Sequence, residues 1–232
     1  MFGTALVTGA NRGLGFEFVR ALLTRAGTVF AGYRSPDTSK QLFALAEKQT
    51  SVVPVRLDVQ DDSTIAKARD EISSRTESLD LLINNAAILL NSESGFDQLT
   101  RESLNRHLDV NVSGPHLVVN EFLPLLRKSE IARVANISSD MGSITGASTS
   151  SPAYRISKAA LNMLTRIQAH GLRGDKIVIV SINPGWLRTD MGGKSAALDP
   201  AESAKQILDL IERMSLRDSG RFMDRRGKDI PF

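Results

Sequence analysis

The sequence predicts an α/β protein with one doubly wound parallel sheet of about seven strands and helices on both faces. Two observations carry this prediction. Short runs of β-branched and apolar residues alternate along the chain with longer segments of helical periodicity, which is the pattern of βαβ units. Some runs are also continuously apolar, as at residues 177–180, because strands of a parallel sheet are buried on both faces.

Seven runs are expected to form the strands. One of them contains Pro54, which cannot donate a ladder hydrogen bond and therefore argues against a central place in the sheet. The expected strands are residues 4–8, 28–33, 52–57, 79–83, 131–137 and 177–182, with 220–223 as a short last strand.

Helical spacing of apolar residues predicts the segments between these strands. The longest helix should be interrupted at Gly114-Pro115, and either Asp61 or Asp62 should cap the third. The expected helices are residues 13–25, 38–48, 62–75, 99–126, 152–168 and 200–214.

Composition limits the class of protein. The chain has 232 residues, of which 41% are hydrophobic and 24% charged, and this suits one globular domain over residues 1–232. The absence of cysteine excludes disulfides, thiolate metal sites and a cysteine nucleophile. Because the three histidines are scattered, no metal site is expected.

Charge and hydropathy argue against nucleic acid and membrane as partners. The 29 basic and 26 acidic residues leave a net charge of +3, which attracts nucleic acid only weakly. No segment reaches the ~18 apolar residues that a membrane span needs. The N-terminus runs into a strand pattern without a basic leader, so we expect no signal peptide and a cytoplasmic location.

A glycine-rich turn follows the first expected strand and opens the first helix. Residues without a Cβ let the backbone bend tightly and approach a pyrophosphate, and the helix N-terminus supplies N–H groups and partial positive charge. This context favours a Rossmann fold with a dinucleotide site over an ordinary turn. The residues expected to bind the cofactor here are Gly9, Asn11, Arg12, Gly13, Leu14 and Gly15.

The end of the second strand favours NADPH/NADP+ as the cofactor. An acid at this point would bind the ribose 2′-hydroxyl of NAD, but the strand is followed by Arg34. Arg34, together with Arg12 in the glycine turn, could bind a 2′-phosphate through bidentate hydrogen bonds. The alternative is that Arg34 is a solvated loop charge.

Tyr154 and Lys158 stand four positions apart, one above the other on a helix face. Ser151 is the expected N-cap of this helix and Pro152 its first residue, which places Tyr154 in the first turn. A tyrosine has an ordinary pKa near ~10, and a nearby ammonium and a helix N-terminus should both lower it. The pair is therefore a candidate acid–base group.

Polar and small residues follow three further strands, at Asn84–Ala87, Ser138-Ser139 and Pro184-Gly185. The carboxyl ends of parallel strands meet at one edge of the sheet, where ligands of open α/β folds bind. We therefore expect these residues to share one site with Tyr154 and Lys158.

Taken together, these motifs resemble the short-chain dehydrogenase/reductase superfamily over essentially the whole chain. Within it, the chain most resembles the C-factor/sniffer-like carbonyl reductases, through residues 136–144, 153–163, 184–193 and 229–232. The resemblance implies an NADPH-dependent oxidoreductase that reduces an aldehyde or ketone. The alternative is an NADP(H)-binding signalling or regulatory protein with little turnover.

The resemblance also implies catalytic roles. Tyr154 would donate a proton to the carbonyl oxygen, Lys158 would lower its pKa and hold the nicotinamide ribose, and Ser139 would hydrogen-bond the substrate oxygen. Asn111 would hold a water in a proton relay to Lys158. Ser138 is the alternative to Ser139, but it is more suited to supporting the strand end.

The cofactor cleft implied by the resemblance draws on several strand ends. Asp58 would bind adenine through its side chain and Val59 through its backbone, and Thr189 would contact either the nicotinamide carboxamide or the pyrophosphate. The cofactor-binding residues outside the glycine turn are then Arg34, Asp58, Val59, Asn85, Ala86, Tyr154, Lys158, Pro184, Gly185 and Thr189.

The substrate walls are expected in loops at residues 89–98, 141–151 and 191–198. The spacing from Ser139 to Tyr154 is slightly longer than is common in the family, and residues 146–151 could absorb the difference. Trp186, Met141 and Met191 could line the substrate cleft or simply pack beside it.

Assembly into a homodimer or homotetramer is expected, since the family commonly pairs two helices across a two-fold axis. The candidate interface residues on the helices at 99–126 and 152–168 are Leu117, Val118, Phe122, Leu161 and Leu164. The alternative is that these residues only cover the sheet.

Overall fold

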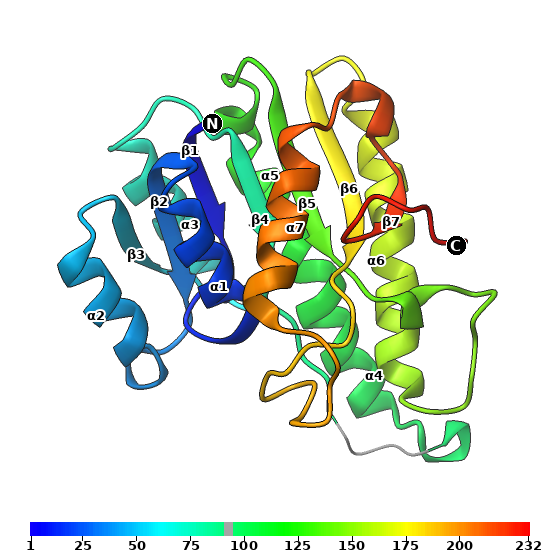
Figure 1. Cartoon of the computed structure of the whole chain (residues 1–232). Coiled ribbons are helices and arrows are strands. Elements are labelled where there is room, and N and C mark those ends of the chain that lie inside the picture. The colour runs from blue at the N-terminus through cyan, green and yellow to red at the C-terminus, as the bar shows by residue number, and fades with distance from the viewer. Residues whose placement is uncertain (91–94) are drawn as a thin grey trace.

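The structure is a computed structural model that describes residues 1–90 and 95–232. One parallel sheet of seven strands runs through its centre in the order β3-β2-β1-β4-β5-β6-β7 (Figure 1). The strands are β1 (Phe2–Val7), β2 (Ala26–Tyr33), β3 (Val52–Arg56), β4 (Leu81–Asn84), β5 (Ala132–Ile137), β6 (Ile177–Asn183) and β7 (Phe222–Asp224). The predicted fold class is therefore confirmed.

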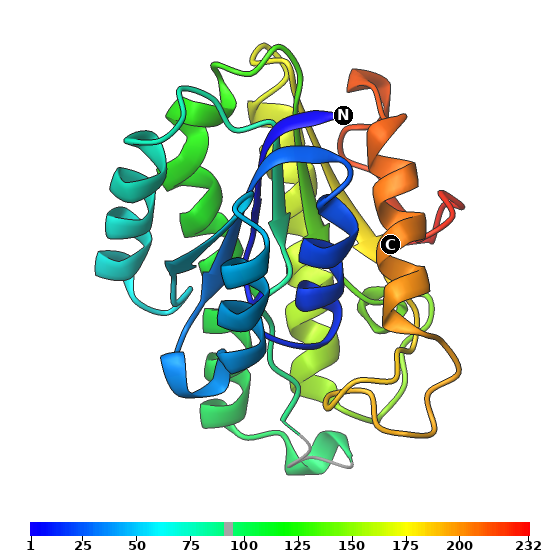
Figure 2. The same ribbon diagram turned by 60° about the vertical axis from the view of Figure 1, so that its left-hand side comes forward.

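Helices cover both faces of this sheet, as the turned view shows (Figure 2). They are α1 (Gly13–Leu22), α2 (Lys40–Lys48), α3 (Asp62–Ser73), α4 (Arg101–Leu108), α5 (Gly114–Leu126), α6 (Pro152–Gly171) and α7 (Pro200–Glu212). Apolar side chains of α1, α2 and α7 form one core cluster against the sheet, and those of α3, α5 and α6 form the other.

Alternation along the strands explains why both faces are apolar. In β6, Val178 and Val180 belong to one core cluster, whereas Ile177 and Ile179 belong to the other. Successive side chains of a strand point to opposite faces, so a strand covered on both sides must be apolar throughout. The prediction made from the run at 177–180 is confirmed.

Pro54 lies in an edge strand, where a residue without a backbone N–H is tolerated. Its strand, β3, lies at the edge of the sheet and pairs only with β2, so the missing N–H of Pro54 breaks no hydrogen bond to a second neighbouring strand.

The N-cap of α3 is Asp61, whose side chain accepts hydrogen bonds from the backbone N–H groups of Ser63 and Thr64. Asp62 is the first residue of that helix.

The long helical segment departs from the prediction. Its regular structure changes at a π-helical stretch over Asp109–Ser113, and α5 then begins at Gly114 with Pro115 in its first turn. Pro115 has no N–H and cannot close the usual bond to the carbonyl of Asn111 four residues earlier. The break therefore lies N-terminal to the Gly114-Pro115 pair rather than at it.

The structure corrects two residue-level expectations. Ser151 occupies the expected N-cap position of α6, but its φ of 51° lies in the left-handed region and its side chain makes no cap hydrogen bond. Val118, Phe122 and Leu161 are buried at 0%, 0% and 1% exposure, so these three belong to the core of their own chain and not to an interface. The exposed apolar residues of α6 are instead Ile156, Met163 and Ile167.

Candidate active site

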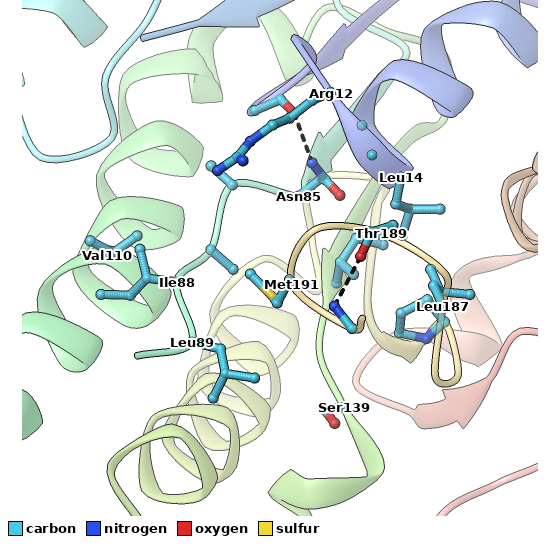
Figure 3. A pocket seen from close by; sticks show the side chains of 18 of the residues that line it. Arg12, Leu14, Asn85, Ile88, Leu89, Val110, Ser139, Leu187, Thr189 and Met191 are labelled. Atoms are coloured by element: carbon cyan, nitrogen blue, oxygen red, sulfur yellow. Dashed lines mark hydrogen bonds between the residues drawn. The ribbon is translucent and has the colours of Figure 1, made fainter. Parts of the chain in front are cut away.

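A large cavity opens at the carboxyl edge of the sheet, where β1 and β4 lie side by side and the strand order reverses. Its volume is about 680 Å³. In Figure 3, Leu14, Asn85 and Thr189 lie toward one end, Ile88 and Leu89 along one side, and Ser139 at the other end. The cavity therefore joins the glycine turn to the candidate catalytic residues.

Every cofactor-binding residue predicted from the sequence lines this cavity. The predicted catalytic residues Ser139, Tyr154 and Lys158 line it as well. Asn111 lies behind the wall, with 1% exposure. The structure thus brings together residues that are far apart in the sequence.

The glycine turn has the geometry that phosphate binding requires. Gly9 and Gly13 adopt φ of 62° and 54°, a region that other residues rarely visit. A Cβ on Gly15 would collide with the carbonyl oxygen of Gly9 and would lie 2.5 Å from the Asn85 amide nitrogen. The turn therefore leaves its backbone bare at the N-terminus of α1, where a pyrophosphate can approach.

Asn85 holds this turn from the neighbouring strand β4. Its amide nitrogen donates to the carbonyls of Thr8 and Gly9 at 3.0 and 3.2 Å. The hydroxyl of Thr8 in turn accepts the backbone N–H groups of Asn85 and Ala86, both at 3.0 Å. These bonds tie the ends of β1 and β4 together beneath the cleft.

The adenosine end is formed by the ends of β2 and β3. Arg34, Thr38 and Asp58 all line the cavity there. Thr38 was not predicted, and the only sequence signal is its place in the polar stretch after Arg34. Asn11 reaches across the turn and donates to the carbonyl of Thr38 at 3.0 Å, so the glycine turn and the Arg34 loop form one unit.

Arg12 is engaged differently from the prediction. Its guanidinium pairs with Asp190 at 2.8 Å, and both side chains are largely exposed. Asp190 lies in the loop after β6, and both partners of this ion pair line the cavity. A 2′-phosphate would have to compete with Asp190 for Arg12, whereas Arg34 forms no salt bridge within residues 1–90 and 95–232.

Thr189 and Trp186 occupy the same loop. The Thr189 methyl group lies 3.5 Å from where a Cβ on Gly13 would be, so Thr189 sits beside the phosphate-binding turn. Trp186 lines the cavity with 58% of its surface exposed, and its indole N–H donates to the Gly192 carbonyl at 2.8 Å. Trp186 therefore lines the cavity and also packs against Gly192, and Met141 and Met191 line the cavity with it.

The two serines after β5 have different surroundings. The Ser138 hydroxyl is buried and donates to the Asn162 side chain at 2.7 Å, which anchors the strand end to α6. The Ser139 hydroxyl accepts the Met141 backbone N–H at 3.2 Å and also contacts Tyr154. Ser139 is thus the serine placed beside the tyrosine.

Burial dominates the electrostatics of Tyr154 and Lys158. It raises the pKa of Tyr154 to about 12; the hydrogen bond with Ser139 opposes this shift and the negative charge of Asp140 adds to it. Burial also lowers the pKa of Lys158 to about 7. The sequence-based expectation of a lowered tyrosine pKa is wrong here, because burial outweighs the interactions that would lower it. The Lys158 ammonium donates to the Ile137 carbonyl and lies 5.6 Å from the tyrosine ring centroid.

Asn111 was expected to hold a relay water, but its side chain bonds to other residues of the protein. Its side-chain nitrogen donates to the Ile88 carbonyl and the Ser157 hydroxyl at 3.0 and 2.9 Å, and its oxygen accepts the Ile88 N–H at 2.9 Å. Both N–H groups of the side-chain amide are therefore used within the protein, and its oxygen already accepts one of the two hydrogen bonds that it can accept. The loop expected at 89–98 lies partly outside the described residues, at 91–94.

Two other kinds of site are absent from the described parts of the chain. No helix there is both long and apolar enough to cross a membrane. Within the same residues, His, Asp and Glu side chains form no group of three that could hold a metal ion.

The fold and the cavity define a Rossmann-type dinucleotide-binding protein. Residues 3–199 match the family model described as short chain dehydrogenase. The C-signal protein of Myxococcus xanthus is 37% identical over 162 residues, which cover 68% of this chain and 95% of that protein. The chain belongs to the short-chain dehydrogenase family.

Solved structures give the same result. The NADPH-bound carbonyl reductase from chicken fatty liver has a TM-score of 0.95 and 36% identity, with 100% of this chain and 99% of that chain covered. The carbonyl reductase Sniffer of D. melanogaster has a TM-score of 0.94 and 30% identity, with both chains covered completely. The protein is thus an oxidoreductase of this family with a nicotinamide cofactor, similar to carbonyl reductases and to C-signal.

Proposed function

We propose that this protein reduces an aldehyde or ketone with NADPH as the hydride donor. The observation that carries the proposal is one cavity that holds the glycine turn at one end and Ser139, Tyr154 and Lys158 at the other. The similar chicken carbonyl reductase was solved with NADPH bound. A nicotinamide cofactor supplies a hydride to the carbonyl carbon, and the protein must supply a proton to the oxygen.

The two shifted pKa values suit a proton donor of this kind. With its pKa at about 12, Tyr154 keeps its proton at neutral pH and can donate it to the carbonyl oxygen. The phenolate that remains needs a positive charge, and Lys158, with a pKa of about 7, carries one in part of the molecules at neutral pH. Ser139 would hydrogen-bond the substrate oxygen and orient it toward Tyr154.

The cofactor would be held along the rest of the cavity. The glycine turn and Thr189 would face the pyrophosphate, while Asp58 and Val59 would contact the adenine. Arg34 would bind the 2′-phosphate, with Arg12 available once it leaves Asp190. The remaining contacts would come from Asn85, Ala86, Pro184 and Gly185.

The experiment is a panel of aldehydes and ketones, scored by NADPH oxidation with the purified protein. Turnover of at least one compound above the cofactor-only rate is the expected result. The similarity to C-signal makes an NADP(H)-binding signal or regulator the second candidate. Tight NADPH binding with no turnover on the whole panel would favour that second function.

A further inference from the structure

His107, near the end of α4, is a buried histidine with no part in the chemistry proposed so far. Its exposure is 1%, so its ring nitrogens must find partners within the protein. The ring lies between the cavity wall after β4 and the ring of Tyr154.

Two of the three hydrogen-bond contacts of His107 fix which nitrogen carries the proton; the third, at 3.4 Å, joins Nδ1 to the Ser103 hydroxyl. Nδ1 is 2.8 Å from the Ser103 carbonyl oxygen, which can only accept. Nε2 is 3.2 Å from the backbone nitrogen of Leu90, which can only donate. His107 is therefore the neutral Nδ1–H tautomer, and its Nε2 lone pair holds Leu90.

His107 and Asn111 act on the same short segment. They are one helical turn apart, and Asn111 holds Ile88 through both its N–H and its carbonyl. The residues that they hold, Ile88 and Leu90, flank Leu89. Ile88 and Leu89 line the cavity opposite the loop that carries Met191, as Figure 3 shows.

The same histidine ring packs against the candidate acid. The ring centroids of His107 and Tyr154 are 6.3 Å apart, and the planes meet at 74°. This edge-to-face arrangement is favourable between aromatic rings and restricts the tilt of the tyrosine. One side chain thus contacts both the substrate wall and the proton donor.

We propose that His107 is a positioning residue that keeps the cavity wall at Leu89 and the ring of Tyr154 in fixed relation to each other. Its Nε2 holds the wall and its ring surface supports Tyr154. This inference rests on the proposed function, because the relation matters only if a carbonyl compound lies between the two.

Two substitutions separate the two contacts. His107→Gln places an amide oxygen near the Nε2 position, so it keeps an acceptor for Leu90 but removes the ring. His107→Phe keeps a ring against Tyr154 but has no acceptor. His170→Phe is the matched control, since His170 is exposed at the far end of α6.

Two measurements are needed. Hydrogen exchange of the Leu90 amide reports the bond to His107 without any catalysis. Steady-state kinetics with NADPH and para-nitrobenzaldehyde, together with the dissociation constant of NADPH, report the site. His107→Phe leaves the Leu90 N–H without its hydrogen-bond acceptor, so the cavity wall is held less firmly. KM should therefore rise by about tenfold, with kcat and NADPH binding changed far less.

The expected result is a crossed pattern. His107→Phe exposes the Leu90 amide and raises KM, while His107→Gln keeps the amide protected, recovers most of the KM and lowers kcat. Parallel losses in both variants, or unchanged Leu90 exchange in His107→Phe, would overturn the proposal. Absence of turnover by the unmutated protein on the whole panel of aldehydes and ketones would instead overturn the proposed function, and the exchange data would still show whether His107 holds Leu90.

Discussion

At the scale of single residues, burial decides the chemistry of the site more than charge pairing does. Tyr154 and Lys158 are 8% and 2% exposed, and both pKa shifts follow from the loss of water. Spacing in the sequence predicts that these residues share a helix face. It cannot reveal that the Lys158 ammonium bonds to Ile137, because that contact depends on where β5 ends.

Lys158 should make stability depend on pH. Its pKa is 10.5 in an unfolded chain and about 7 in the folded protein, so between these values the unfolded state binds the extra proton. The free energy of unfolding should therefore rise with pH across this window, and it should lose this contribution as pH falls toward 7. Urea unfolding at several pH values should show that rise, and Lys158→Met should flatten it. An equal slope in both proteins would contradict the buried-lysine account.

Arg34 should set the preference for the phosphorylated cofactor. Each charged hydrogen bond to the 2′-phosphate contributes ~1.5–3 kcal/mol, so NADPH should bind more tightly than NADH by about 2 kcal/mol or more. Arg34→Asp should erode or reverse this preference, measured as dissociation constants for both cofactors. Arg173→Asp, on an exposed residue after α6, is the control for the change of charge. Equal constants in the unmutated protein would contradict the assignment.

At the scale of elements, periodicity predicts which segments are helices and strands, and local contacts decide how they end. The strand at 177–182 was predicted to within a residue, because its apolar run has no competing pattern. The π-helical stretch at Asp109–Ser113 was not predicted. It lies where Pro115 lacks a backbone N–H and where the Asn111 side chain bonds to the backbone of Ile88. The spacing of apolar residues in the sequence reveals neither effect on the helix.

Gly15 tests the element that binds the phosphates. Gly15→Ala places a methyl group against the Gly9 carbonyl, so the turn must shift. The dissociation constant for NADPH should rise by at least about tenfold, or ~1.4 kcal/mol. Gly171→Ala, at the end of α6 with no atom within 4 Å of the added methyl, should be neutral or stabilise the protein by up to ~1 kcal/mol. Cofactor titration and thermal unfolding of both variants check this pair, and unchanged NADPH binding in Gly15→Ala would contradict it.

At the scale of the whole molecule, parallel topology gathers the site from chain segments far apart in sequence. Six consecutive strands end at one edge with their polar residues in one cavity, which is why the general location of the site could be predicted. The loops at residues 89–98, 141–151 and 191–198 were expected to supply its walls, and Leu89, Met141 and Met191 from these loops do line the cavity. Other wall residues could not be predicted. Thr38, Ile88 and Asp190 line the cavity through loop conformations that have no periodic signal.

The outer surface of α6 predicts self-association. Ile156, Met163 and Ile167 are 42%, 61% and 61% exposed, and their helical spacing places them along one side of the helix. We expect a dimer or tetramer with a symmetric interface there. Light scattering at micromolar concentration should report it, and Ile167→Glu should shift the protein toward monomer. A monomeric mass for the unmutated protein would contradict the prediction.

The most direct test of the account is single-turnover reduction by Tyr154→Phe, measured beside an NADPH titration. The substitution removes one hydroxyl, and the predicted phosphate contacts lie at the other end of the cavity. General acid catalysis contributes ~10²–10⁴-fold, so the rate of carbonyl reduction should fall by that factor while NADPH affinity stays nearly unchanged. Full activity in Tyr154→Phe would contradict the account, because the proton would then come from another group.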